Sequence, residues 1–255
     1  MSIRDGRSRS LVALSLQMLL LGLLLFAWHY VTVAGWVSRW LLPHPDQVAE
    51  QLYRVLVTGT ILPDLALTVY ELVTAFMIAA VLGILIGYAV GTSRYLTQSF
   101  EPVFAGVFAI PIVVFYPLCI LYFGLGPDSK IVFGALHGFF PIVLSTIAGL
   151  VSVDRRLLEA ARSMGASDGQ IIRLVLLPAA FPIVLSGLRI GVTLTFLAII
   201  GGETLGALNG LGHKIVWAAE AMDTALMYAY IVLVVVMAAV LYFGVAQLEP
   251  RRRTA

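Results

Sequence analysis

The sequence has 255 residues, of which 60% are hydrophobic and only 12% are charged. Soluble domains contain about 45–50% apolar and about 25% charged residues, so this composition indicates an integral membrane protein. The formal net charge is +2 and the only cysteine is Cys119, which argues against a nucleic-acid-binding surface and against an intramolecular disulfide.

Runs of about 20 apolar residues, the length that an α-helix needs to cross the hydrocarbon layer, predict the fold. They predict an all-α integral membrane protein with six transmembrane helices, at about residues 11–33, 66–91, 102–123, 131–151, 181–203 and 226–247. The first run is longer than the apolar part of a signal peptide, about 7–15 residues, so we expect it to be retained. We expect a tail, first span and external connection in residues 1–60, a five-helix core in residues 61–248, and a basic tail in residues 249–255.

The positions of the basic residues predict the orientation, because cytoplasmic loops of membrane proteins are enriched in Lys and Arg. If the N-terminus is cytoplasmic, the same side holds Arg4, Arg7, Arg9, Arg94, Arg155, Arg156, Arg162, Arg173, Arg251, Arg252 and Arg253. The opposite side then holds Arg39, Arg54, Lys130 and Lys214. Both termini are therefore predicted to be cytoplasmic, and the connection of residues 34–63 to be external, with a short amphipathic helix from Gln47 to Leu56.

Glycines recur every four residues in three predicted spans, at Gly83, Gly87 and Gly91, at Gly134 and Gly138, and at Gly187 and Gly191. Small residues at this spacing let helix backbones approach closely in lipid. The spacing predicts a tightly packed bundle and says nothing of an activity.

A polar segment interrupts the apolar chain between the fourth and fifth predicted spans. Asp154 is placed to cap the start of a helix, and Gly165 to end it in a left-handed conformation. Ser167 and Gln170 have the spacing of a capping box that begins a second helix. The pattern predicts a cytoplasmic helix, turn and helix, although composition alone also fits a loop at the lipid interface.

The first of these helices carries a narrow apolar stripe at helical spacing, typical of a helix that docks on a partner: Leu157, Leu158, Ala161 and Met164. Its sequence also has a distinctive order: Glu159-Ala160-Ala161, three residues, Gly165, nine residues, Val175, one residue, and Leu177-Pro178. This order resembles the cytoplasmic signature of permease subunits in binding-protein-dependent ABC importers. Val175 stands where that family usually has isoleucine.

The resemblance extends over roughly residues 60–248 and is strongest to the nitrate, sulfonate and taurine branch of these permeases. The similar segments are Ile110-Pro111 through Pro117-Leu118, Tyr122 to Gly126, Asp128 to Ile131, Leu177 to Ala180, and Gly187-Leu188-Arg189. Two positions depart from that branch: Phe108 stands where a basic residue is expected, and Ile112 replaces a common proline. Because of these two departures, the resemblance identifies the family but not the substrate.

The resemblance implies a permease of the type I fold in a prokaryotic cytoplasmic (inner) membrane, surrounded by membrane lipid. Two copies, expected to be a homodimer, would form the path, and an external binding protein would deliver the solute. A separate ABC ATPase would use the ATP, so the chain itself would bind no cofactor. The polar insert would be the coupling helix, with Glu159, Ala160, Ala161 and Gly165 in contact with the ATPase. An alkanesulfonate, taurine or nitrate is the expected substrate, although similar permeases also carry neutral solutes.

Ionisable residues inside spans are energetically costly and therefore candidates for function. Glu71, His137 and Arg189 are such residues, and Ser186, Arg189 and Thr193 share one face of the fifth span. One interpretation is a translocation path in which Arg189 attracts an anion. The other is an arginine inside the bundle, paired with helix carbonyls or with an acidic side chain such as Glu203. Gly201 to Glu203 and Asn209 to Gly212, near the outer end of this span, suggest a gate or hinge.

Motifs for chemistry on the chain itself are missing from the sequence. The only lysines, Lys130 and Lys214, are each followed by isoleucine and lack the spacing of a nucleotide-binding loop. We find no zinc motif and no nucleophile beside a base, so we expect no enzyme and no metal site. An alternative function is an ATP-independent channel or secondary carrier that uses Glu71, His137 and Arg189. A third possibility, an intramembrane enzyme, is disfavoured because the sequence shows no paired catalytic residues.

Overall fold

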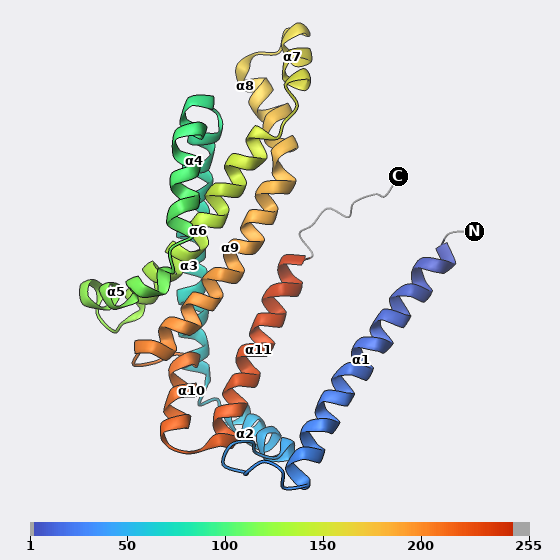
Figure 1. The fold of residues 1–255 in the computed structure, drawn as a ribbon, viewed down its shortest axis with the longest axis vertical. Helices are drawn as coiled ribbons and strands as arrows, with labels where there is room; N and C mark the ends of the chain where they lie inside the picture. Colours follow the sequence, from blue (N-terminus) through green and yellow to red (C-terminus); the bar gives the residue numbers. More distant parts are fainter. Residues whose placement is uncertain (1–2, 247–255) are drawn as a thin grey trace. The chain divides into compact units, whose positions relative to one another are not determined.

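The computed structural model describes the backbone of residues 3–246 and the side chains of residues 15–244, so the predicted basic tail of residues 249–255 lies outside the described residues. Within this range every regular element is a helix (Figure 1). In chain order these are α1 (Ile3–Val33), α2 (Pro45–Val57), α3 (Leu62–Gly91), α4 (Arg94–Phe108), η1 (Ile112–Phe115), α5 (Tyr116–Phe123), α6 (Pro127–Val151), α7 (Arg155–Ser163), α8 (Asp168–Ile171), η2 (Ile172–Leu176), α9 (Leu177–Gly206), α10 (Leu211–Glu220) and α11 (Thr224–Ala246).

Five helical segments of the described chain are long and apolar enough to cross a membrane: Ser15–Val33, Leu62–Gly91, Pro127–Val151, Asp168–Glu220 and Thr224–Gly244. The predicted span at 102–123 is wrong as a single straight helix, because α4 and the helix of Ile112–Phe123 meet at an angle of 77°. Pro111 lies at the bend, where it lacks an N–H group and disfavours helical backbone in the residue before it. The count becomes six if this bent pair is one broken span.

The chain divides into two compact units, which we describe separately. The terminal unit comprises residues 1–61 and 214–233, and the core unit comprises residues 62–213 and 234–255. In the terminal unit, Trp28 of α1 donates from its indole nitrogen to the carbonyl of Pro43 at 3.0 Å. Tyr228 of α11 donates from its hydroxyl to the carbonyl of Leu41 at 3.2 Å. These bonds hold the chain before α2, the helix that the sequence predicts in this connection.

The core unit is built on α3, α6 and α9, which pack against one another along their glycines (Figure 1). A Cβ atom at Gly87 of α3 would lie 2.6 Å from the Cβ of Thr146 in α6. A Cβ atom at Gly187 of α9 would lie 2.3 Å from the Cβ of Ser145 in α6. Contacts this short require glycine, so the predicted close packing of helices at these glycines is confirmed.

Candidate functional sites

The polar segment after α6 folds as the sequence predicts, into a short helix, a turn and a second helix. The carboxylate of Asp154 accepts a hydrogen bond from the backbone N–H of Arg156 at 2.9 Å and so caps α7. Gly165 has a φ of +81°, a left-handed conformation that ends α7 at low steric cost. The backbone N–H of Ser167 then donates to the side chain of Gln170 at 2.9 Å, which caps α8.

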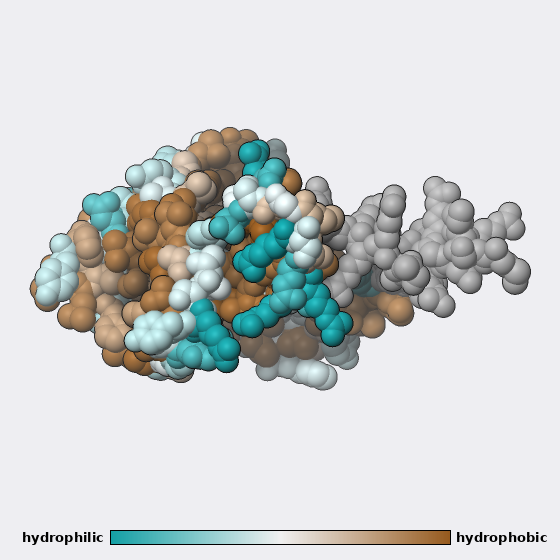
Figure 2. All heavy atoms as spheres, turned by 90° about the horizontal axis from the view of Figure 1, so that it is seen from above, coloured by the Kyte–Doolittle hydropathy of each residue, from teal (hydrophilic) through white to brown (hydrophobic). Residues whose placement is uncertain are grey.

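The apolar stripe predicted on α7 divides into a buried part and an exposed part. Ala161 is 4% exposed and Leu158 is half-buried, so these two residues hold α7 to the core unit. Leu157 is exposed, and Met164 at the end of the helix is 81% exposed. Glu159 and Ala160 are exposed as well. Figure 2, which looks onto this end, shows hydrophilic side chains gathered around it. The helix thus presents an apolar and charged surface that the described residues leave uncovered.

The second helix does not stop before the next span. Residues 168–206 are helical throughout: α8 continues into η2, a π-helical segment, and η2 continues into α9. Pro178 closely follows η2 in this helix and has no N–H group to donate to the preceding turn. The turn after α7 is therefore joined to the long helix α9 by continuous helical backbone.

The predicted path residues of α9 lie together on one face. Ser186 and Thr193 are exposed, and Arg189 between them is half-buried. The hydroxyl of Ser186 donates to the carbonyl of Pro182, and that of Thr193 donates to the carbonyl of Arg189, both at 3.0 Å. Since both hydroxyls are satisfied by their own helix, Arg189 supplies the charge of this face.

The other predicted path residues lie elsewhere. Glu71 is buried in α3, and His137 of α6 is half-buried, with its Nδ1 atom 2.9 Å from the carbonyl of Phe133 and its ring against that of Phe133. The suggested pair of Arg189 with Glu203 is wrong. Both residues belong to α9, and their separation along the helix is about 21 Å at 1.5 Å per residue.

Glu203 instead belongs to a buried polar cluster at the far end of α9. Its carboxylate accepts hydrogen bonds from the hydroxyl of Thr68 at 2.6 Å and from the backbone N–H of Gly212 at 2.7 Å. The hydroxyl of Thr68 also accepts from the backbone N–H of Leu211 at 3.0 Å. The carboxylate of Asp64 accepts from the backbone N–H of Gly210 at 2.8 Å. Three side chains thus fix the start of α10 against α3 and α9.

Charged and aromatic groups complete this cluster. Lys130 of α6 is buried, donates to the carbonyls of Leu125 and Gly126, and attracts the carboxylates of Glu71 and Glu203. The hydroxyl of Tyr116 lies 2.6 Å from the carbonyl of Gly202 and 3.0 Å from that of Gly206. These contacts cross-link the ends of α3, α5, α6 and α9.

Sequence reasoning found Glu71 and Glu203 but missed their partners. Asp64, Thr68 and Glu71 stand at i, i+4 and i+7 on one face of α3, a polar stripe that was present in the sequence. Lys130 was placed in an external loop, whereas the structure buries it inside α6. Only the fold brings Tyr116, Lys130 and Glu203 together.

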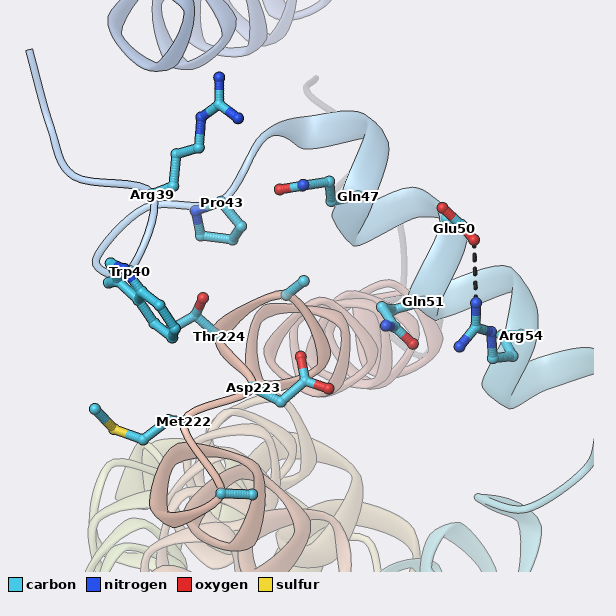
Figure 3. A pocket seen from close by; sticks show the side chains of 12 residues that line it. Arg39, Trp40, Pro43, Gln47, Glu50, Gln51, Arg54, Met222, Asp223 and Thr224 are labelled. Carbon is cyan, nitrogen blue, oxygen red and sulfur yellow. Dashed lines mark hydrogen bonds and ion pairs between the residues drawn. The ribbon is translucent and has the colours of Figure 1, made fainter. Parts of the chain in front are cut away.

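A pocket of about 540 Å³ opens in the terminal unit (Figure 3). It is lined by Arg39, Trp40, Pro43, Gln47, Glu50, Gln51, Arg54 and Ala221 to Ala225. Arg54 and Glu50 form an exposed ion pair at 3.1 Å, and the carboxylate of Asp223 accepts from the backbone N–H of Leu226 at 3.0 Å. In the described chain we find no group of His, Cys, Asp and Glu side chains that could hold a metal ion.

The apolar helices and the tight glycine packing define a polytopic helical membrane protein, with an exposed helix-turn-helix segment at one end of its core unit. Residues 79–254 match the family described as the binding-protein-dependent transport system inner membrane component. The chain belongs to this family of transport permeases. Family membership supports the ATP-driven permease over the channel or secondary carrier.

Curated relatives cover most of the chain. The taurine transport system permease protein TauC of Escherichia coli (strain K12) is 32% identical over 236 residues, which are 91% of this chain and 86% of TauC. The riboflavin transport system permease protein RibX of Chloroflexus aurantiacus is 33% identical over 237 residues, which are 93% of this chain and 88% of RibX.

The fold is shared with a solved transporter structure. An inward-facing structure of the MetNI methionine ABC transporter aligns with a TM-score of 0.58, covering 71% of this chain and 92% of the other at 23% identity. At this identity the likeness shows the fold alone.

Proposed function

We propose that two copies of this chain form the translocation path of an ATP-driven importer for a small anion of the sulfonate, taurine or nitrate class. The observation that carries the proposal is α7, a capped helix whose exposed surface is left uncovered at one end of the core unit. A separate ABC ATPase would dock there and use the ATP. A binding protein would deliver the solute on the opposite side of a prokaryotic inner membrane.

The orientation of this proposal follows the basic residues. Arg94, Arg155, Arg156, Arg162 and Arg173 all lie at the end of the core unit that carries α7, and cytoplasmic ends of spans are enriched in arginine. We therefore place α7 and both termini in the cytoplasm. The polar cluster of Asp64, Thr68 and Glu203 then lies toward the outer face.

Each residue of the coupling surface has a physical role in the proposal. Ala160 and Ala161 are small, so α7 lies close both to a groove on the ATPase and to the core unit. Glu159 is exposed and offers a charge to the partner. Gly165 permits the sharp turn into α8, because its φ of +81° is strained for other residues. Movement of α7 on ATP binding would pass through η2 into α9.

The substrate class rests on Arg189 and on the similarity to TauC. The exposed face of Ser186, Arg189 and Thr193 would line the path against the second copy, and the guanidinium group would attract a sulfonate or nitrate. Glu71 and His137 are the less favoured path residues, since Glu71 is buried in the outer cluster. RibX is named as a riboflavin transport permease, and riboflavin is neutral, so a neutral solute is the competing substrate class.

Uptake by the chain reconstituted with its ATPase and binding protein tests the coupling role. We expect Gly165→Pro and Glu159→Lys each to lower taurine uptake while ATP hydrolysis continues, because the helix would no longer transmit closure. Membrane insertion should be unchanged, as measured by the yield of monodisperse protein. Gly169→Ala is the matched control, since Gly169 is exposed and a Cβ atom there meets nothing within 4 Å.

Two results would decide against parts of the proposal. Unchanged uptake in both variants would show that α7 is a passive loop. Riboflavin uptake that exceeds taurine uptake, with intact coupling, would retain the importer but reject the anionic substrate.

A further inference from the structure

A second pocket lies behind α7 in the core unit and has no role in the proposed transport cycle. It has a volume of about 560 Å³ and is formed where α3, α4, α6, α7, α8 and η2 come together. Its lining combines basic side chains of α4 and α7 with apolar residues at the ends of α3, α6 and η2. Volumes of about 300–1,000 Å³ are typical of sites for small molecules.

The rim of this pocket is strongly basic. Arg94 enters from the first turn of α4, and Arg155 and Arg162 enter from α7. Asp168 is the one acidic residue of the lining. Within the described part of the chain, the structure gives the three guanidinium groups no ion pair, with Asp168 or with any other carboxylate. The three arginines therefore make the pocket electropositive, so it favours an anionic ligand.

The inner wall is apolar and belongs to the membrane helices. Leu150 and Val151 are the last residues of α6, and Leu176 directly precedes α9. Gly91, the last residue of α3, closes the same wall. The pocket thus lies where α3 and α6 end and η2 passes into α9. In the proposed orientation this is the headgroup level at the cytoplasmic side. A ligand that fits has a phosphate at the arginines and an apolar part along the helices.

We propose that this pocket binds the phosphodiester headgroup of an anionic phospholipid, with the phosphate between Arg94 and Arg155 and the acyl chains along α6 and η2. Guanidinium groups bind phosphate through paired hydrogen bonds, and basic pockets between membrane helices on the cytoplasmic side suit anionic headgroups. The inference uses the cytoplasmic orientation proposed above but does not depend on the transported solute. The lipid would brace α7 against the ends of α3 and α6.

Lipid binding to the full-length chain in mild detergent tests the proposal. Phosphatidylglycerol and phosphatidylcholine are added separately, and their dissociation constants are measured by native mass spectrometry. We expect phosphatidylglycerol to bind at least about tenfold more tightly. The double variant Arg94→Gln with Arg155→Gln should weaken phosphatidylglycerol binding about 25-fold, at about fivefold for each arginine near the membrane surface.

A matched variant removes the same charge outside the pocket. Arg156→Gln with Arg173→Gln alters two exposed arginines of the same segment that do not line the pocket, and it should leave binding almost unchanged. A third variant, Arg94→Lys with Arg155→Lys, keeps the charge and should retain most of the binding. If the double glutamine variant fails to fold, the single variants Arg94→Gln and Arg155→Gln, each expected to weaken phosphatidylglycerol binding about fivefold, decide the question.

Three outcomes would overturn the proposal. If the pocket variant and its matched control lose the same amount of phosphatidylglycerol binding, the binding depends on general surface charge and not on the pocket. If phosphatidylcholine binds as tightly as phosphatidylglycerol, the pocket does not select for an anionic headgroup. Displacement of the lipid by millimolar inorganic phosphate, with equal thermal stabilisation by phosphate alone, would identify a site for a free anion and not for a lipid.

Discussion

Arg189 is the residue whose place in the fold bears most directly on the transported solute. It stands half-buried between two hydroxyl groups that are already satisfied by the carbonyls of Pro182 and of Arg189 itself. The hydroxyls therefore contribute bulk and polarity, whereas the guanidinium group contributes the charge. A charged hydrogen bond contributes about 1.5–3 kcal/mol, so the role of this one side chain is measurable.

We expect Arg189→Gln to raise the KM for uptake of an anionic substrate by about tenfold or more, because a charge-assisted hydrogen bond is lost. Arg189→Lys keeps the charge and should change KM much less. Thr193→Val, on the same face, serves as the control, and KM is measured by uptake into proteoliposomes. If the glutamine and lysine variants have equal KM values close to that of the unaltered protein, Arg189 has only a structural role.

At the scale of the helices, packing depends on positions where the backbones touch. Gly187 of α9 meets Ser145 of α6 so closely that a single added methyl group has no room. Gly201 belongs to the same helix, and a Cβ atom there meets nothing within 4 Å in the core unit as described. An alanine at either position gains the same intrinsic helix preference, but only an alanine at position 187 would meet a neighbouring helix. Comparing the two substitutions therefore isolates the effect of packing.

We expect Gly187→Ala to destabilise the protein by about 1–3 kcal/mol, the usual cost of overpacking a tight interface. Gly201→Ala should be neutral or slightly stabilising, since alanine favours helix over glycine by about 1 kcal/mol. The thermal unfolding midpoints of the two variants in detergent provide the comparison. A midpoint for Gly187→Ala at or above that of Gly201→Ala would contradict the close approach of α6 and α9.

The helices and the docking segment could be predicted from sequence because their signals are local. The caps at Asp154, Ser167 and Gly165 and the glycine spacing of α3, α6 and α9 each fix backbone geometry within a few residues. The bend at Pro111 was missed because the apolar run continues through it. The buried cluster around Glu203 was only half predicted, because its partners lie more than 100 residues apart in the sequence.

At the scale of the whole molecule, the proposed mechanism requires a mechanical connection between α7 and the membrane helices. The continuous helical backbone from Asp168 to Gly206 provides it. The π-helical segment η2 is the one departure from α-helical geometry in this described connection, and Val175 lies within it. In the proposed mechanism, breaking the helix there would separate docking of the ATPase from transport.

We expect Val175→Pro to abolish uptake while the ATPase still copurifies, because proline removes an N–H group and costs about 3 kcal/mol inside a helix. Val175→Ile keeps the helix and should transport normally. Val175→Gly, at a cost of about 1 kcal/mol, provides an intermediate case if the proline variant does not fold. Full uptake by Val175→Pro would mean that motion reaches the path by another element.

The length of this continuous helix has a geometrical consequence. At 1.5 Å per residue, the segment from Asp168 to Gly206 is about 58 Å long, nearly twice the hydrocarbon thickness of about 30 Å. Its outer end is anchored by Glu203, and its inner end carries α7. If Glu203 is a fixed pivot in the proposed mechanism, a tilt of about 5° there would displace the end of the helix at Asp168 by about 5 Å. In this mechanism a small displacement of the ATPase would correspond to a still smaller displacement near Glu203, so the force would increase as the distance moved decreases.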